Sequence, residues 1–283
     1  MDRDDCAYLI NTTPKYFYLL PLHLALLHRY APNLKWPIYL ATEAPELLPP
    51  LEHPNLVILT LPMTASGFLE SRETATELLP MNIKYVFPIQ EDFLLEGRPM
   101  EKEIAEAFAV LDSSGEWGYG QKVHSVRLMP CPGPKSKRKY MGSTNSTDST
   151  NSTDSVNSTK SIKFTLEELD FQLDSLVFTY QATLWERKLY QTFMTTLLHK
   201  LQGLSQKEKN RMAISVNIAE IQDGQTILKS LSAGKHLSVP REYSHPNAVY
   251  LCAWPYRPTA VVRGSLEPWA IQLAEREGFP LNR

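Results

Sequence analysis

The sequence predicts an α/β fold, in which a single domain is built on a mostly parallel central sheet flanked by helices. Short apolar runs alternate with helix-like segments along the first half of the chain, and this order is typical of consecutive strand–helix units. The chain has 283 residues, of which 43% are apolar and 21% charged. That composition is enough for one sizeable core, and it excludes a chain that is disordered or fibrous throughout.

Strands and helices of the first half are expected where the spacing of apolar residues changes. The expected strands are 6–10, 37–41, 56–59, 84–90 and 125–129, which are short apolar runs bounded by turn residues. The expected helices are 15–30, 66–79 and 100–111, which have apolar residues at helical spacing. Pro32 and Pro80 end the first two helices, because proline cannot continue a helix.

The composition changes abruptly after residue 134. A basic cluster at 135–139 is followed by a six-residue repeat that begins at Asn145, Asn151 and Asn157. A segment with so few apolar side chains cannot bury enough surface to offset the entropy lost on ordering. We therefore expect residues 135–163 to be a disordered low-complexity insertion that divides one domain into the parts 1–134 and 164–283.

The second part of the domain mixes helices with more widely separated strands. A helix start is expected at 165–168, helices at 184–201 and 266–277, and strands at 213–221, 250–252 and 260–262. Pro268 in the first turn and Gly278 just past the end of the last helix are typical of helix termini. The chain therefore reads as one interrupted domain.

Charge and hydropathy exclude several classes of protein. A net charge of −2 gives no electrostatic reason to expect a nucleic-acid partner. The apolar run 16–27 has only about half the length that crosses a bilayer, so no membrane span is expected. The acidic start of the chain does not match a secretory leader, and we expect a cytoplasmic protein. Cys6, Cys131 and Cys252 lie too far apart to indicate a zinc cage or a disulfide framework.

An acidic pair follows the apolar strand 84–90 directly, and it is the sharpest feature of the sequence. Glu91 and Asp92 stand at the carboxyl end of that strand, where open α/β sheets bind their ligands. Burying two adjacent carboxylates is costly unless a cation or hydrogen bonds neutralise them. Mg²⁺ or Mn²⁺ suits this position, because such ions take one or two carboxylates and complete their shell with phosphate oxygens and water. The alternative is an ordinary strand end with solvated acids.

This strand with its acidic end resembles the metal-binding motif of type A nucleotide-sugar-dependent glycosyltransferases, the GT-A fold, and is similar to small viral and microbial sugar transferases. Gln90 stands where the strict motif has an acid. The resemblance implies a GT-A-like domain in which Asp92 binds a divalent metal and Glu91 assists at the donor. It also implies that 1–134 binds the nucleotide sugar and that 164–283 lies on the acceptor side.

Further segments resemble the same enzymes in the expected order. After the first strand, Thr12 and Thr13 resemble the contacts to base and ribose, and Arg72 resembles an arginine that approaches the donor diphosphate. Segment 178–187 resembles the acceptor side, with Gln181, Trp185 and Arg187 as candidate contacts. The alternatives are an exposed helix pair of Arg72 with Glu70 or Glu73, and a core position for Trp185.

Segment 217–225 resembles the acidic stretch that follows the acceptor segment. Glu220 is the leading candidate for the general base that deprotonates the acceptor hydroxyl, and Asp223 is the second. The alternative is that Asp223 caps a helix and that Glu220 is solvated. His236 and His245 are candidates for a third metal contact.

The sequence therefore predicts a metal-dependent glycosyltransferase that moves a sugar from a nucleotide-diphosphate donor to the hydroxyl of a glycan or other acceptor. Two alternatives stay open. One is a nucleotidyltransferase on a similar fold, although its Gly-rich basic phosphate loop is missing here. The other is a non-catalytic glycosyltransferase-like binding protein.

Overall fold

The computed structural model describes residues 1–65, 67–112, 123–128, 136–146, 160–169, 182–202, 247–250, 253–257, 259–262, 264–279 and 281. The strands of the main sheet are β1 (Cys6–Asn11), β2 (Ile38–Thr42), β3 (Leu56–Thr60), β4 (Tyr85–Gln90), β6 (Val123–Arg127), β7 (Ser136–Ser146), β8 (Lys160–Leu169), β9 (Thr183–Glu186) and β10 (Asn247–Tyr250). The α-helices are α1 (Leu20–Tyr30), α2 (Phe68–Leu78), α3 (Glu101–Asp112), α4 (Arg187–Gln202) and α8 (Pro268–Glu277).

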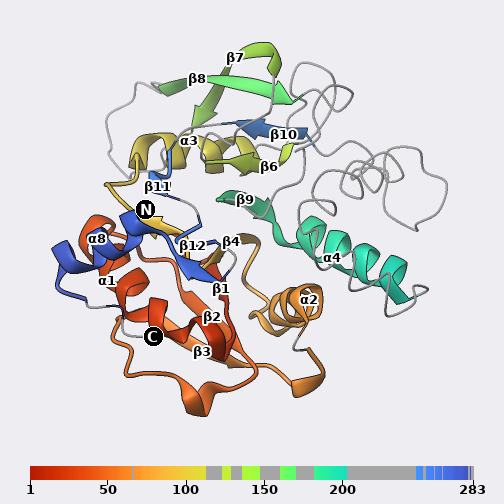
Figure 1. The fold of residues 1–283 in the computed structure, drawn as a ribbon. Helices are drawn as coiled ribbons and strands as arrows, with labels where there is room; N and C mark the ends of the chain where they lie inside the picture. The colour runs from red at the N-terminus through yellow and green to blue at the C-terminus, as the bar shows by residue number, and fades with distance from the viewer. Residues whose placement is uncertain are drawn as a thin grey trace, which may run out of the picture.

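Over the described residues the main sheet has nine strands, in the order β3-β2-β1-β4-β9-β6-β10-β8-β7 (Figure 1). Parallel pairing joins β3, β2, β1 and β4, and also joins β6 to β10. Because β9 is antiparallel to both of its neighbours, and β8 to both of its own, these two strands alone oppose the other seven. The predicted α/β class with a mostly parallel sheet flanked by helices is confirmed.

Helices cover both faces of the sheet, because its strands are apolar on both sides. In β1, Tyr8 and Ile10 belong to a core cluster shared with α1, α3 and α8, here called the α1-side core. Ala7 and Leu9 belong to a second cluster shared with α2 and α4, the α2-side core. Figure 1 shows α1 and α8 on one side of the sheet and α2 and α4 on the other. The continuous apolar run in β1 thus reflects burial on both faces.

Short elements connect the main ones. The 3₁₀ helices are η1 (Pro14–Leu19), η2 (Pro45–Leu47) and η3 (Met63–Ala65). Two small antiparallel sheets pair β5 (Leu94–Leu95) with β11 (Tyr256–Arg257), and β12 (Val261–Val262) with β13 (Ser265–Leu266). The expected helix 15–30 is therefore a 3₁₀ turn followed by α1.

Most of the expected elements agree with the structure to within one or two residues, but two expectations about the second part of the domain were wrong. Residues 165–168 lie inside β8, which pairs with β7 and with β10, instead of starting a helix. Residues 184–186 form most of β9, so the expected helix begins only at Arg187. The apolar side chains of Leu184 and Trp185 match a central strand between β4 and β6 as well as they match a helix. The expected strand 213–221 lies outside the described residues.

Within the expected insertion 135–163, the structure describes only the two ends. Residues 136–146 form β7, and 160–163 begin β8, which pairs with β7 in an antiparallel ladder. Composition misses such a pairing, because the ladder satisfies backbone groups whatever the side chains are, and threonine suits a strand. Residues 147–159 lie outside the described residues.

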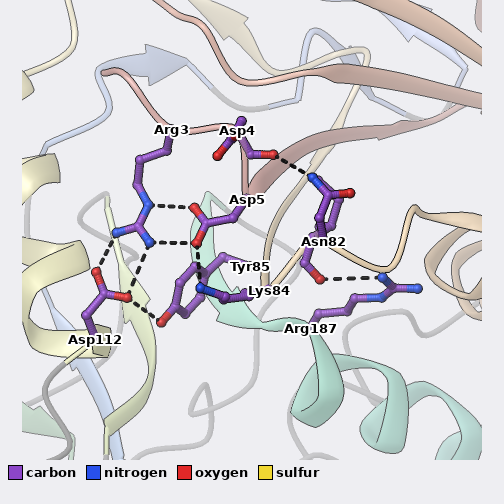
Figure 2. Close-up of polar contacts among 9 residues, drawn as sticks. Arg3, Asp4, Asp5, Asn82, Lys84, Tyr85, Asp112 and Arg187 are labelled. Atoms are coloured by element: carbon purple, nitrogen blue, oxygen red, sulfur yellow. Dashed lines mark hydrogen bonds and ion pairs between the residues drawn. The ribbon is translucent and has the colours of Figure 1, made fainter.

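The amino edge of the sheet is closed by a polar cluster around Arg3 (Figure 2). The Arg3 guanidinium donates to Asp5 and to Asp112, the last residue of α3. It also lies over the Phe108 ring, 4.4 Å from the ring centroid. The Tyr85 hydroxyl donates to Asp112 over 2.8 Å. This cluster joins the starts of β1 and β4 to the end of α3.

Candidate functional site

The candidate site lies where β1 and β4 end at the carboxyl edge of the sheet. The two strands are parallel neighbours, and Asn11 is paired in register with Gln90. Thr12 and Glu91 therefore leave the sheet side by side. This is the edge at which open α/β sheets bind ligands.

After β1, a buried threonine has a hydroxyl without a partner. Thr12 is 5% exposed, and its Oγ1 has no hydrogen-bond partner. A buried hydroxyl left unpaired costs free energy, so such a group is typical of a position that a ligand completes. Asn11 is held beside it, since its Nδ2 donates to the carbonyl of Ser71 over 3.1 Å. Thr13 is half-buried and begins η1 without capping it through its side chain.

Glu91 is a buried carboxyl group at the start of the turn after β4. It is 6% exposed, and burial together with the neighbouring Asp92 charge raises its pKa to about 8. The Arg72 charge acts in the opposite direction on this pKa. The main-chain carbonyl of Glu91 accepts a hydrogen bond from His23 Nδ1 over 3.2 Å.

Asp92, the next residue, has a carboxyl group that is incompletely satisfied. Its Oδ1 is buried and has no hydrogen-bond partner. Burial raises the pKa of Asp92 to about 6, and the backbone N–H of Val261 opposes that rise. The Asp92 carbonyl accepts the N–H of Ala260 over 2.9 Å, so the segment that leads into β12 packs against the acidic turn.

The two acids fit a hard divalent cation. Among the described residues no group of three or more His, Cys, Asp or Glu side chains is placed to hold a metal. The protein would thus supply one or two carboxylates, and phosphate oxygens and water would complete the shell, as Mg²⁺ and Mn²⁺ accept. The unpaired Asp92 Oδ1 and the raised pKa values of both carboxyl groups indicate a position where a positively charged ligand would be favourable.

Arg72 is a buried cation on α2, not an exposed helix residue. Its side chain is 5% exposed. One guanidinium nitrogen donates to the Phe68 carbonyl over 2.9 Å, and the guanidinium lies 3.5 Å from the centroid of the Phe68 ring. Because the Arg72 charge acts on the Glu91 carboxyl, α2 contributes positive charge to the side of the acidic turn.

Two of the acceptor candidates lie at the other end of the sheet. Trp185 is 2% exposed in the α2-side core and is paired in register with Val86. The end of β4 at Gln90, which leads into the acidic turn, lies four residues further along the strand, about 13 Å at strand spacing. β9 runs antiparallel to β4, so the chain moves from the carboxyl end of β4 towards its amino end as β9 proceeds. Trp185 therefore lies beside the start of β4 and not beside the acidic pair.

Arg187 follows Trp185 away from the acidic pair. Its guanidinium donates to the carbonyls of Leu79 over 2.8 Å and Pro80 over 2.6 Å, just past the end of α2. Its backbone N–H bonds the Lys84 carbonyl before β4. In this position the guanidinium joins α2 to α4 and does not face the acidic turn.

The remaining candidates, Gln181, Glu220, Asp223, His236 and His245, lie outside the described residues. Sequence reasoning missed His23, which reaches Glu91 from α1. The available signal was a lone polar residue between Leu22 and Leu24 on an apolar helix. That pattern indicates burial but gives no indication of the partner.

The comparisons with known proteins identify no family. No family model matches the sequence, and a search of the curated proteins finds no match. Among solved structures, the chain is similar to S. aureus TarS 1-349, with 11% identity and a TM-score of 0.41, over 89% of this chain and 59% of that one. It is also similar to a second S. aureus TarS structure, with 11% identity and a TM-score of 0.37, over 66% of this chain and 29% of that one.

The chain thus spans less than two thirds of either TarS structure. With both TM-scores below 0.5, this likeness carries no argument about function.

None of the helices in the described part of the chain has the length and apolar character that a bilayer-spanning segment needs.

Proposed function

We propose that the chain is a metal-assisted glycosyltransferase, which transfers a sugar from a nucleotide-diphosphate donor to an acceptor hydroxyl. The observation that carries this proposal is the acidic turn after β4, where Glu91 is buried and Asp92 Oδ1 is buried without a partner. A buried carboxyl group next to one with an unpaired oxygen, at the carboxyl edge of a parallel sheet, favours a ligand that brings positive charge.

Asp92 is the proposed metal ligand, and Glu91 assists it. A divalent cation held there would offset the charge that develops on a departing diphosphate. The chain itself contributes the binding and orientation of the donor. The unpaired hydroxyl of Thr12 lies one residue past the end of β1, the strand that pairs with β4, and is proposed to provide a hydrogen bond for the nucleoside. Thr13 follows it at the start of η1.

Arg72 is proposed to act on the donor diphosphate. Its charge acts on Glu91 from α2, so an anion bound at the acidic turn with a cation would also lie within its field. The acceptor hydroxyl must lose a proton when the new glycosidic bond forms. Glu220, or failing it Asp223, is the proposed general base for that proton, on the resemblance of segment 217–225 alone.

A thermal-shift panel tests the proposal. UDP, GDP, CDP and ADP are each added to the protein with Mn²⁺ or with EDTA, since a ligand that binds only the folded state raises the melting temperature. We expect one diphosphate to raise it in Mn²⁺ and to lose most of that effect in EDTA. If a diphosphate stabilises the protein equally in EDTA, metal assistance is wrong. If none binds, the non-catalytic alternative takes the place of the enzyme.

A further inference from the structure

A buried histidine lies beneath the acidic turn and has a partner at each ring nitrogen. His23, on α1, is 3% exposed. Its Nδ1 lies 3.2 Å from the main-chain oxygen of Glu91, and its Nε2 lies 2.9 Å from the Tyr8 hydroxyl. An imidazole in an apolar core costs free energy unless both nitrogens are hydrogen-bonded. The two contacts meet that requirement.

The partners determine where the protons lie. A carbonyl oxygen can only accept, so His23 Nδ1 must carry the proton that is donated to Glu91. In the neutral ring Nε2 is then an acceptor, and the Tyr8 hydroxyl donates to it. Both nitrogens are committed in this way, so the ring has no lone pair left to bind a metal or to take a proton from a substrate.

Tyr8 is itself held firmly. Its ring packs against Phe87 and Trp254, with centroid distances of 5.5 Å and 6.0 Å. Tyr8 lies in β1 and Phe87 in β4, so the hydroxyl is fixed by the same two strands that end at the site. The hydrogen-bonded chain from Tyr8 through His23 to Glu91 therefore joins the rigid sheet to the turn.

Backbone contacts hold the acidic turn from two sides. The N–H of Phe93 closes it on the Gln90 carbonyl over 3.1 Å. His23 holds the Glu91 carbonyl from α1, and the N–H of Ala260 holds the Asp92 carbonyl from the segment before β12. Since the backbone of so short a turn sets the direction of its side chains, these contacts also set where the two carboxyl groups point.

We propose that His23 is a positioning residue for the metal site. Its hydrogen bond to the Glu91 carbonyl, backed by Tyr8, holds the turn in the conformation that presents the carboxyl groups of Glu91 and Asp92 to a divalent cation. This inference rests on the proposed function, and it adds a residue that acts only through the backbone of the turn.

The test compares two substitutions that each keep one half of the imidazole. His23→Asn places an amide nitrogen near the position of Nδ1, so it keeps a donor for Glu91. His23→Gln places its amide near Nε2, so it keeps a partner for Tyr8 and loses that donor. We expect His23→Gln to weaken Mn²⁺ binding to the full chain about ten-fold, the size of effect seen for residues that orient metal ligands. His23→Asn should stay within about three-fold of the unaltered protein.

Mn²⁺ binding is measured by electron paramagnetic resonance of the free ion, and backbone amide exchange in EDTA gives a readout that needs no metal. The N–H of Ala260, which bonds Asp92, should exchange faster in His23→Gln than in His23→Asn, while amides of β2 exchange alike in both. Equal Ala260 exchange in the two variants overturns the positioning role, whatever the Mn²⁺ result. If the unaltered protein binds no Mn²⁺, the proposed metal use fails, and the exchange arm alone decides whether His23 holds the turn.

Discussion

At the residue scale, the acidic turn contains groups whose burial lowers the stability of the folded protein. Glu91 is buried and Asp92 is half-buried, and their pKa values are raised to about 8 and about 6, so each carboxyl group is held where its charged form is disfavoured. Neighbouring Thr12 adds a buried hydroxyl without a partner. Unfavourable groups gathered at one sheet edge are typical of a functional site, because a ligand can remove the penalty that the free protein bears.

The pH dependence of stability should expose that penalty. A carboxyl whose pKa is raised on folding binds more protons in the folded state, so its contribution to stability is present at low pH and is lost as pH rises through the folded pKa. For Glu91 the loss extends from its ordinary value of 4.5 to about 8. Burial lowers the pKa of His23 to about 4, so His23 makes the folded protein less stable as pH falls. This effect is confined to pH values below the ordinary His pKa of 6.5.

Between pH 6.5 and 8.5, in EDTA, we therefore expect the melting temperature to fall. Glu91→Gln removes the titrating group and keeps the size of the side chain, so its melting temperature should fall less over the same interval. Calorimetry at four or five pH values measures both slopes. Parallel slopes would mean that the Glu91 carboxyl titrates normally in the folded protein.

Removing the Asp92 charge should separate binding from folding. Asp92→Asn keeps the shape of the side chain but loses the charge that holds a cation. We expect nucleotide-diphosphate binding to lose its dependence on Mn²⁺ and sugar transfer to fall about 100-fold or more, while the melting temperature is unchanged or higher. Glu91→Gln is the matched control, with a smaller loss of transfer. Unchanged Mn²⁺-dependent binding in Asp92→Asn would place the metal elsewhere.

At the element scale, the spacing of apolar residues predicted the strands that carry the site. It failed where a short buried strand and the start of an apolar helix have the same pattern. An apolar run ending in acids identified β4, because a strand buried on both faces has no polar position until it ends. Leu184 and Trp185 were assigned to a helix, because a short buried strand and the start of an apolar helix have the same pattern. That error also hid the direction of β9, which carries Trp185 and Arg187 away from the acidic pair.

Arg187 is therefore expected to matter for stability and not for substrate binding. Its guanidinium donates to the carbonyls of Leu79 and Pro80 just past the end of α2, and Pro80 also accepts the N–H of Ile83. Arg187→Met keeps the apolar stem and should lower the free energy of unfolding by about 1–2 kcal/mol. Chemical denaturation measures the loss, and the affinities for donor and acceptor should stay unchanged. A selective loss of acceptor saturation, with stability intact, would restore Arg187 to the acceptor side.

At the scale of the whole molecule, the two edges of the sheet have different roles. At the carboxyl edge, Thr12 and Asp92 each have a buried polar atom without a hydrogen-bond partner, whereas the amino edge is closed by the cluster of Arg3, Asp5 and Asp112 (Figure 2). The sequence alone could place the acidic pair at the carboxyl edge, since that follows from strand direction. It could not place His23 beneath the pair or Arg3 against Asp112, because those contacts join residues 68 and 109 positions apart and depend on helix packing.

We therefore expect substitutions at the two edges to have separate effects, one on stability and the other on Mn²⁺-dependent binding. Arg3 pairs with Asp5 and lowers the pKa of that carboxyl through their hydrogen bond, and it also covers the Phe108 ring. Arg3→Met retains an apolar stem over the ring but leaves Asp112 without its cation and Asp5 with Lys84 alone. We expect a loss of about 2 kcal/mol in the free energy of unfolding with Mn²⁺ and nucleotide affinities unchanged.

Asp92→Asn should give the reverse pattern, with stability retained and Mn²⁺-dependent binding lost. Denaturant titration and calorimetric binding on the same two variants measure all four quantities. The prediction is wrong if Arg3→Met weakens Mn²⁺ binding while most of the protein is still folded. That result would mean that the two ends of β1 and β4 are energetically coupled through the sheet, and the acidic turn would then depend on the packing of the whole strand pair as well as on its local contacts.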